Sequence, residues 1–208
     1  MKIHDISMEI KEGMVVWKNR DSKRPKFTVT AEYSKDHANE SRIDMDLHTG
    51  THADAYFHML NDGEKIGGIP LDRFIGKCRV LDLTRAKGMI TEKDLKGSDI
   101  KKGEIILLKT RNRPEKEFDT GFAFVGREAA TYLAKKKIKT LGVDSLGVER
   151  DQPWNDTHRI LFSNDITIIE GLELSGIKHG DYFLVALPLR INADASPVRA
   201  VLVEGIGK

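Results

Sequence analysis

Residues 48–58 hold three of the seven histidines of this chain together with one carboxylate. Imidazole nitrogen and carboxylate oxygen are the ligands of Zn, Mn, Fe and similar divalent ions, and no thiolate is present in the segment. The segment therefore predicts a metal site that draws on His48, His52, Asp54 and His58. The alternative is a polar loop with solvated histidines, but four ligand-type side chains around one glycine favour the metal site.

The backbone around these residues must turn for them to meet. Alternating apolar and polar residues predict a half-buried strand over residues 41–48. If that strand simply continued, His48 and His58 would lie roughly 33 Å apart at about 3.3 Å per residue. Gly50 allows a sharp turn, so that His48 can face His52 and Asp54. The spacing of four between Asp54 and His58 is typical of one helical face.

Length and composition limit the class of protein. The 208 residues suit one domain with a substantial core. A net charge of +2 gives no indication of nucleic-acid binding. The one cysteine, Cys78, stands in the apolar run 78–81, which favours a buried residue of a cytoplasmic protein. The N-terminus has no apolar signal region, and the longest apolar run, 183–189, is too short to cross a membrane.

Strands outnumber helices in the predicted secondary structure. Short runs rich in Val, Ile and Leu without alternation predict strands covered on both faces. These runs are residues 78–84, 104–110, 140–143, 166–169, 182–189 and 198–203. An amphipathic helix is predicted over 127–138, and a shorter one begins at Thr91 with Asp94 completing a capping box. The pattern indicates mixed α and β in layers, with more β than a doubly wound fold has.

Further ligand candidates lie outside the histidine cluster. His158 stands in the polar segment 155–159, ahead of the apolar run 160–162. Glu170 ends a predicted strand, where a carboxylate is either a surface cap or a functional group at a cleft, and its position alone does not decide between them. Asp44 and Asp46 share the predicted strand face of His48. They either orient an imidazole or are solvated.

The pattern His48-x-Gly50-Thr51-His52-x-Asp54-x-x-x-His58 resembles the signature of a family of metal-dependent cyclases and hydrolases that includes bacterial kynurenine formamidase. That signature reads His-x-Gly-Thr-His-x-Asp-x-Pro-x-His. The C-terminal stretches 168–172, 180–182, 186–189 and 194–200 are similar to the same family. The two regions occur in the correct order, more than a hundred residues apart, so the resemblance extends over nearly the whole chain.

The resemblance implies a single domain over residues 1–208 with a strand-rich, mixed α/β fold, the layered swivelling β/β/α arrangement. It also implies a homodimer or homotetramer and two divalent ions per chain, Zn or Mn. It assigns one ion to His48, His52 and Asp54, with Asp54 bridging to a second ion that His158 binds and that Glu170 also bridges. His58 would be the acid/base, and Trp17 would contact the substrate.

Two departures from the family pattern bear on the substrate. The proline of the signature is Tyr56 here, so a phenol either enters the pocket or packs inside the protein. The Pro-Gly-Asp that follows the tryptophan in typical formamidases is replaced by Lys18-Asn19-Arg20 after Trp17. If Tyr56 lines the pocket, we expect weaker activity on N-formylkynurenine than a typical formamidase has.

The expected chemistry is hydrolysis of a small amide, formamide or cyclic amide by water activated on the metals, with His58 moving the proton. An arylformamidase of tryptophan catabolism is the leading form. The alternatives are an isatin-hydrolase-like activity, a lyase or cyclase on the same metals, and a metal-binding protein without turnover. A separate acid/base histidine argues against the last, because metal storage needs none. No nucleic acid or membrane partner is expected.

Overall fold

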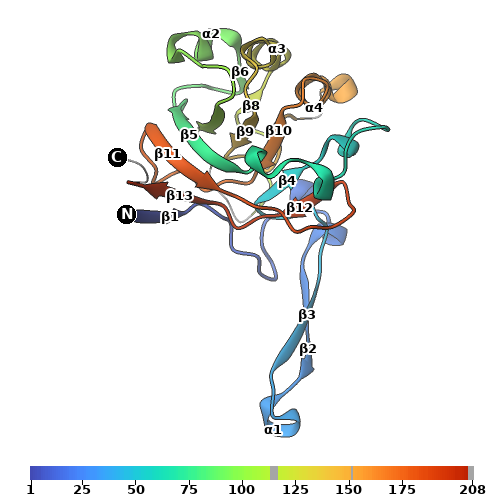
Figure 1. Cartoon of the computed structure of the whole chain (residues 1–208). Helices are drawn as coiled ribbons and strands as arrows, with labels where there is room; N and C mark the ends of the chain where they lie inside the picture. Colours follow the sequence, from blue (N-terminus) through green and yellow to red (C-terminus); the bar gives the residue numbers. More distant parts are fainter. Residues whose placement is uncertain (113–116, 151, 206–208) are drawn as a thin grey trace.

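A computed structural model describes residues 1–112, 117–150 and 152–205 of the chain. Its main element is a nine-stranded sheet in the order β1-β13-β11-β5-β7-β9-β10-β4-β12 (Figure 1). Four neighbouring strands in the middle are parallel: β5 (Ile75–Asp82), β7 (Ile105–Lys109), β9 (Thr140–Val143) and β10 (Thr167–Glu170). These strands correspond to four of the predicted apolar runs, and β7 and β9 are buried almost throughout, as expected of a parallel sheet.

Antiparallel strands flank this parallel centre on both sides. On one side lie β11 (Gly180–Val185), β13 (Val201–Glu204) and β1 (Lys2–Asp5), and beyond β10 lie β4 (His52–Asp54) and β12 (Ala195–Pro197). The sheet therefore brings the first strand against the last, and places β4 between two strands from the C-terminal quarter of the chain.

Three helices lie together at one end of the molecule, against the parallel strands (Figure 1). They are α2 (Glu92–Leu95), α3 (Arg127–Lys136) and α4 (Asp156–Phe162). The predicted capping box is confirmed, because the Asp94 carboxylate accepts hydrogen bonds from both the backbone N–H and the hydroxyl of Thr91. The smaller elements are the parallel pair β6 (Met89–Ile90) and β8 (Phe124–Val125) and 3₁₀ turns at Trp17–Asn19, Asp21–Lys23, Tyr56–His58, Ile66–Gly68, Leu71–Arg73, Lys96–Ser98 and Pro153–Asn155.

A hairpin that we call the arm projects away from the body (Figure 1). It consists of β2 (Lys26–Ala31), β3 (Glu40–Asp44) and the short helix α1 (Tyr33–Asp36) at its tip. The prediction of a half-buried strand over 41–48 is wrong in two respects. The strand ends at Asp44, and every residue of β3 is exposed, because within the described residues β3 pairs only with β2. The alternation comes from the two faces of a hairpin, and His48 lies in the turn that follows.

Other boundaries also differ from the prediction, among them those of β5 (Ile75–Asp82, expected over 78–84) and α3 (Arg127–Lys136, expected over 127–138). The strand expected over 182–189 ends at Val185, and the strand expected over 198–203 begins at Val201. The apolar run 160–162 belongs to helix α4, because a short apolar run does not by itself distinguish a strand from a buried helical face. Cys78 is buried in the main core, as predicted, and burial raises the pKa of its thiol to about 12. In the described part of the chain, every helix is too short or too polar to span a bilayer.

Candidate metal centre

The centre is built on the pairing of β4 with β10. His52 and Asp54 stand two residues apart on β4, so their side chains project from the same face, while Ala53 between them enters the core. The antiparallel register sets Glu170, the last residue of β10, directly opposite His52. Cross-strand partners share a face, so the pairing brings two carboxylates and an imidazole together in a buried place.

Two further imidazoles approach from other elements. His158 lies in the first turn of α4, which is seven residues long and turns His158, Leu161 and Phe162 inward. Its Nε2 lies 3.6 Å from Asp54 Oδ2 and 3.5 Å from Glu170 Oε1. His48, in the turn after the arm, holds its Nδ1 2.9 Å from Asp54 Oδ1. The structure therefore brings together all five residues to which the resemblance assigns a metal.

Each of these three imidazoles has one nitrogen held by an oxygen outside the cluster. His52 Nδ1 lies 2.9 Å from the carbonyl oxygen of Gly50. His158 Nδ1 lies 2.6 Å from Glu149 Oε1, and His48 Nε2 lies 2.9 Å from Asp194 Oδ2. The other nitrogen of each ring faces the central carboxylates. Histidine ligands of metals are oriented in this way, with the second nitrogen bonded to a carboxylate or carbonyl group.

Several atoms at the middle of the cluster have no hydrogen-bond partner among the described residues. They are His52 Nε2 and both carboxylate oxygens of Asp54, all of them buried. His48 Nδ1 lies 2.9 Å from Asp54 Oδ1, but the two atoms are not aligned for a hydrogen bond. His52 Nε2 lies 3.4 Å from Asp54 Oδ1 and 3.4 Å from Glu170 Oε2. A buried polar atom without a partner is costly, and a cation bound between these atoms would satisfy all of them. The donor set therefore fits divalent ions, as the residue types predict.

The two buried carboxylates of the cluster also need positive charge beside them. Burial alone would lower the pKa of His52, but the carboxylates of Asp54 and Glu170 outweigh it and raise that pKa to about 10. Burial would raise the pKa of Asp54 and Glu170, yet the surrounding imidazoles hold both below their usual range. Without metal, the two carboxylates must be balanced by protons on imidazoles. Bound cations would replace those protons.

His58 stands at the edge of the cluster. Asp54 is in a strand and His58 in the 3₁₀ turn Tyr56–His58, so the two do not share a helical face as their spacing suggested. The ring of His58 still lies 4.1 Å from that of His48, centre to centre, and its Nδ1 is 3.6 Å from Asp194 Oδ2. Its side chain is 25% exposed, against 1% for His52, so His58 is the more accessible imidazole.

His58 is close enough to the ligands to bind an ion itself. One nitrogen of His58 can join His48 and Asp54 in a group whose ligand atoms lie within 4.8 Å of one another. His52, Asp54 and Glu170 form a second such group, with Asp54 common to both. The assignment of His58 as a free acid/base therefore remains a prediction, and metal retention in variants tests it.

Two carboxylates beside the centre, Glu149 and Asp194, were not predicted from the sequence. Glu149 accepts from the backbone N–H of Thr157 as well as facing His158, so it fixes both the start of α4 and the ring. Asp194 lies between His48 and His58, just before edge strand β12. Neither lies near the histidine cluster in sequence, and only the topology brings them there. Asp46, by contrast, accepts from Lys23 and from the backbone N–H of His48, so it braces the ligand turn.

Two glycines allow the ligand-bearing turns to touch. Gly50 and Gly171 both have left-handed backbone, with φ of +71° and +68°. A Cβ added to Gly171 would lie 2.5 Å from the carbonyl oxygen of Gly50, closer than van der Waals contact permits. Gly171 directly follows Glu170, and the Gly50 carbonyl is the one that orients His52. A side chain at residue 171 would therefore displace two ligands at once.

We expect Gly171→Ala to destabilise the fold by about 2–3 kcal/mol, from left-handed strain and the contact with Gly50, and to weaken metal retention. Urea unfolding and metal analysis measure the two effects. Gly176→Ala is the control, because a Cβ there meets nothing within 4 Å and the backbone is not left-handed. If the two substitutions changed the free energy of unfolding and the metal content equally, the close approach of residues 50 and 171 would not be what stabilises the fold and the site.

The two expected substrate residues lie in different surroundings. Tyr56 is 9% exposed, packs against Phe162 in the main core and has its hydroxyl 3.4 Å from Thr167 Oγ1. This placement favours the packing interpretation over a phenol in the pocket. Trp17 packs edge-on against Phe118, with ring centres 4.8 Å apart, and lies against Gly147, one residue before the Val148 N–H that donates to Glu170.

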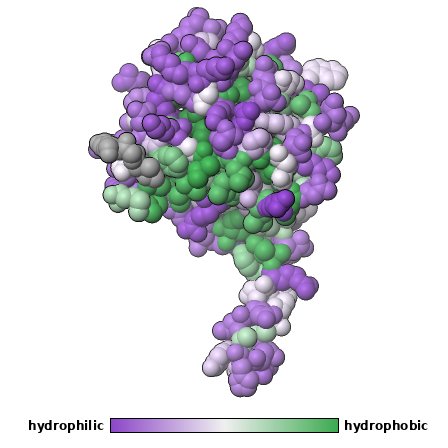
Figure 2. Space-filling view, in the orientation of Figure 1, coloured by the Kyte–Doolittle hydropathy of each residue, from purple (hydrophilic) through white to green (hydrophobic). Residues whose placement is uncertain are grey.

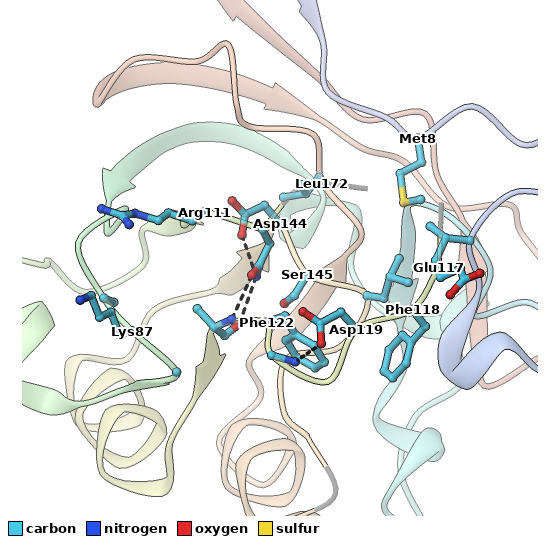
Figure 3. Close-up of a pocket in the computed structure, with 17 residues that line it drawn as sticks. Met8, Lys87, Arg111, Glu117, Phe118, Asp119, Phe122, Asp144, Ser145 and Leu172 are labelled. Carbon is cyan, nitrogen blue, oxygen red and sulfur yellow. Dashed lines mark hydrogen bonds between the residues drawn. The ribbon is translucent and has the colours of Figure 1, made fainter. Parts of the chain in front are cut away.

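A separate cavity of about 320 Å³ lies beyond the carboxyl ends of β5, β7 and β9 (Figure 3). Its walls include Met8, Phe118 and Leu172, and Lys87 and Arg111 lie on one side of it (Figure 3). Asp144, directly after β9, accepts hydrogen bonds from the backbone and hydroxyl of Thr110. It also accepts one from the Asn112 side chain. Asp144 therefore ties β7 to β9 in the wall of the cavity.

Asp144 should make stability depend on pH. Burial raises its pKa from 3.8 to about 6, although its hydrogen bonds oppose the shift. The folded chain keeps this proton up to about pH 6, whereas the unfolded chain loses it near pH 4. The contribution of Asp144 to the free energy of unfolding should therefore fall by about 3 kcal/mol as the pH rises through that window. Asp144→Asn should not show the fall, and urea unfolding of both proteins between pH 4 and pH 7 measures it. If the free energy of unfolding depended on pH in the same way in both proteins, the raised pKa of Asp144 would be contradicted.

Comparison with known proteins places the chain in a family. The sequence profile of the family described as "Putative cyclase" matches residues 4–150, which include the histidine cluster and end before His158 and Glu170. The chain belongs to this family. A solved structure described as a potential metal-dependent hydrolase with cyclase activity is 44% identical, with a TM-score of 0.90 over 97% of this chain and 96% of the other.

Two more solved structures extend the comparison. A predicted metal-dependent hydrolase from Bacillus stearothermophilus is 44% identical, with a TM-score of 0.88 over 97% of each chain. Isatin hydrolase A from Labrenzia aggregata is 21% identical, with a TM-score of 0.86 over 98% of this chain and 94% of that one. Isatin hydrolase A therefore has the same fold as this chain. This cyclase-family chain thus has the strand-rich, layered fold of metal-dependent hydrolases, as the resemblance implied.

Proposed function

We propose that this cyclase-family chain is a divalent-metal-dependent hydrolase that opens a small amide, formamide or cyclic amide. The observation that carries the proposal is the buried cluster in which Asp54 and Glu170 face His48, His52 and His158, with unpaired atoms at its centre. Residues of these types would hold two ions, Zn or Mn by availability. Bound divalent ions acidify a water molecule and polarise a carbonyl oxygen.

His58 is proposed to carry the proton. Burial lowers the pKa of its imidazole below the usual value, so that the ring is neutral at pH 7 and can accept a proton from water. The protonated ring can then donate to the leaving nitrogen, which departs as an amine. Asp194 Oδ2, 3.6 Å from His58 Nδ1, stabilises the charged ring during that interval. In this proposal the buried imidazoles bind the metal ions, and His58 transfers the proton.

Aromatic side chains supply the surface for the substrate in this proposal. Trp17 packs with Phe118 and Phe122, with ring centres 4.8 and 5.9 Å away, and the three form an apolar group beside the 147–148 turn. Val148 of that turn donates its backbone N–H to Glu170 Oε1. An aromatic amide bound against Trp17 would therefore lie near the turn that holds a metal ligand.

The decisive assay uses purified protein loaded separately with Zn and with Mn, and tested on N-formylkynurenine and on isatin. Hydrolysis of the first supports a formamidase. Hydrolysis of isatin alone supports a cyclic-amide hydrolase, an activity that the structural relatives named isatin hydrolase carry. Metal binding with turnover of neither substrate would contradict an amide hydrolase of this kind and favour a lyase, a cyclase or a non-catalytic metal-binding protein.

Tyr56→Pro should change stability rather than substrate choice. Loss of the buried ring is expected to cost about 3 kcal/mol or more, because it leaves a cavity beside Phe162. Tyr56→Phe is the matched control, since it keeps the ring and loses a single hydroxyl contact. The ratio of kcat/KM values for the two substrates should be the same in all three proteins. A shift toward the formyl substrate in Tyr56→Pro would restore the pocket role of Tyr56.

A further inference from the structure

The cavity beyond the carboxyl ends of β5, β7 and β9 has an apolar floor. Met8 and Leu172 are buried there, and Phe118 and Phe122 add two aromatic rings. Its volume of about 320 Å³ suits a small molecule with one ring, since pockets for small ligands begin at about 300 Å³. None of the five proposed metal ligands, all of which the structure describes, lines it. The cavity is therefore separate from the metal centre.

The rim of this cavity carries opposite charges on its two sides. Lys87 and Arg111 lie on one side, and Glu117 and Asp119 lie on the other (Figure 3). Arg111 Nε donates to the carbonyl oxygen of Thr84 at 2.5 Å, which holds the guanidinium group at the rim. Within the described part of the chain, neither the Lys87 ammonium group nor the Glu117 carboxylate has a hydrogen bond or an ion pair. Both are therefore available to a bound molecule.

Charge alone does not distinguish this place on the surface. Figure 2 shows hydrophilic residues covering the end of the molecule that carries α2 and α3. The cavity differs because an apolar floor lies beneath its charges. Such a floor binds the carbon body of a ligand, the two cations attract a carboxylate, and the two rim carboxylates attract an ammonium group. The complementary molecule is a small zwitterion whose opposite charges are separated by an apolar body.

The wall of the cavity is bonded to a proposed metal ligand through residues 144–148. Ser145 lines the cavity, and its carbonyl oxygen accepts from the backbone N–H of Gly171 at 2.7 Å. Val148 donates its backbone N–H to Glu170 Oε1 at 2.5 Å. The segment 144–148 therefore holds Glu170 directly and also through the residue that follows it. A molecule in the cavity would touch the segment that positions this carboxylate.

We propose that this cavity is a second binding site, which takes a small zwitterion with an apolar body between its carboxylate and its ammonium group, and that the bound molecule acts on the metal centre through segment 144–148. Opening of a cyclic amide leaves a carboxylate and an amine on one carbon body, so the proposed reaction would produce molecules of this class. The site itself does not rest on that reaction. The coupling rests on the proposed role of Glu170 as a metal ligand, and it must be reciprocal.

The first test is calorimetric titration of the metal-free full chain at pH 7 with 4-(aminomethyl)benzoate. Metal-free protein is used because a carboxylate could otherwise bind the ions. The matched probes are 4-methylbenzoate, which lacks the ammonium group, and benzylamine, which lacks the carboxylate. We expect one zwitterion per chain, with a dissociation constant lower than that of either matched probe by about tenfold or more. A matched probe that binds as tightly as the zwitterion would overturn the ligand class, and no saturable binding would overturn the site.

Substitutions at the rim locate the bound probe. Lys87→Glu should weaken the binding of both the zwitterion and 4-methylbenzoate by about tenfold or more, whereas Glu117→Gln should weaken the binding of the zwitterion alone. Lys102→Glu is the control, because Lys102 is also exposed but lies before the amino end of β7, away from the cavity. It should bind like the wild type. Equal weakening in Lys87→Glu and Lys102→Glu would indicate attraction by overall charge and would overturn the site.

The coupling is tested by titrating Zn against a chromophoric chelator with and without saturating 4-(aminomethyl)benzoate. The dissociation constant of Zn should change by about threefold or more, and Zn should change the affinity of the probe by the same factor. Lys87→Glu at the same probe concentration should show no change. An unchanged Zn affinity in the wild type would overturn the coupling, and a change that persists in Lys87→Glu would place the probe on the metal. None of these measurements involves turnover, so failure of the proposed reaction would leave them unaffected.

Discussion

Replacing Glu170 or His158 with alanine is expected to remove most of the bound metal, whereas His58→Ala should retain it and lose on the order of 10²–10⁴ in turnover. Glu170 and His158 face the buried centre, where His158 Nε2 lies 3.6 Å from Asp54 Oδ2 and 3.5 Å from Glu170 Oε1, so each removal takes a ligand atom away from the middle of the cluster. His58 is more exposed and contacts the cluster from its edge. Metal content per chain after gel filtration, with kcat measured on metal-saturated protein, separates the two classes.

Glu173→Ala is a suitable control for the metal analysis, because Glu173 lies three residues after Glu170 and outside the cluster. It should bind metal like the wild type. Equal metal loss in the His58, His158 and Glu170 variants would make His58 a ligand and would contradict its role as proton carrier. Its proximity to His48 and Asp54 makes that outcome a physical alternative.

Metal-replete protein is expected to contain two divalent ions per chain, and their removal by a chelator should abolish activity almost completely. Activated water and a polarised carbonyl together contribute several kcal/mol to the transition state, so a loss of at least a thousandfold is expected. Saturating metal should also raise the free energy of unfolding, by about 4 kcal/mol when the free ion is a thousand times its dissociation constant. Elemental analysis, kcat and urea unfolding measure the three effects.

The number of bound ions tests whether Asp54 bridges two metals. Asp54 belongs to both groups of residues that could hold an ion, which is the arrangement expected of a bridging carboxylate. At most one ion per chain in saturated protein would contradict the binuclear site. A single ion held by His48, His52 and Asp54 would then be the arrangement to test.

The residues of the centre were largely predictable, and their geometry was not. The histidine cluster has a local signal, because ligands separated by two or four residues stand out in the sequence. Glu170 was undecided from its position, and only the pairing of β10 with β4 brings it opposite His52. Glu149 left no local signal, and Asp194 stood out only as part of the family-like stretch 194–200, with no role assigned to it. Their contacts join residues 9 and 146 positions apart, and such contacts follow from the topology of the sheet.

The errors in secondary structure have two physical causes. The alternation over 41–48 was attributed to a strand against the core, although a hairpin with one apolar face gives the same pattern. The helix α4 was overlooked because its apolar residues, Ile160, Leu161 and Phe162, are consecutive and its charged first turn resembles a loop. The parallel strands and α3 were predictable because burial on both faces, or on one helical face, leaves an unambiguous pattern of residue types.

The order in which the sheet is built decides when a metal can first bind. β4 carries His52 and Asp54, but its neighbours β10 and β12 follow it by more than a hundred residues. A nascent chain that has only just displayed residues 48–58 has three imidazoles and one carboxylate with nothing to hold them in place. The proposed ligands can therefore all meet a divalent ion only once β10 has paired with β4, and the supply of metal at that moment would decide which ion the site takes up.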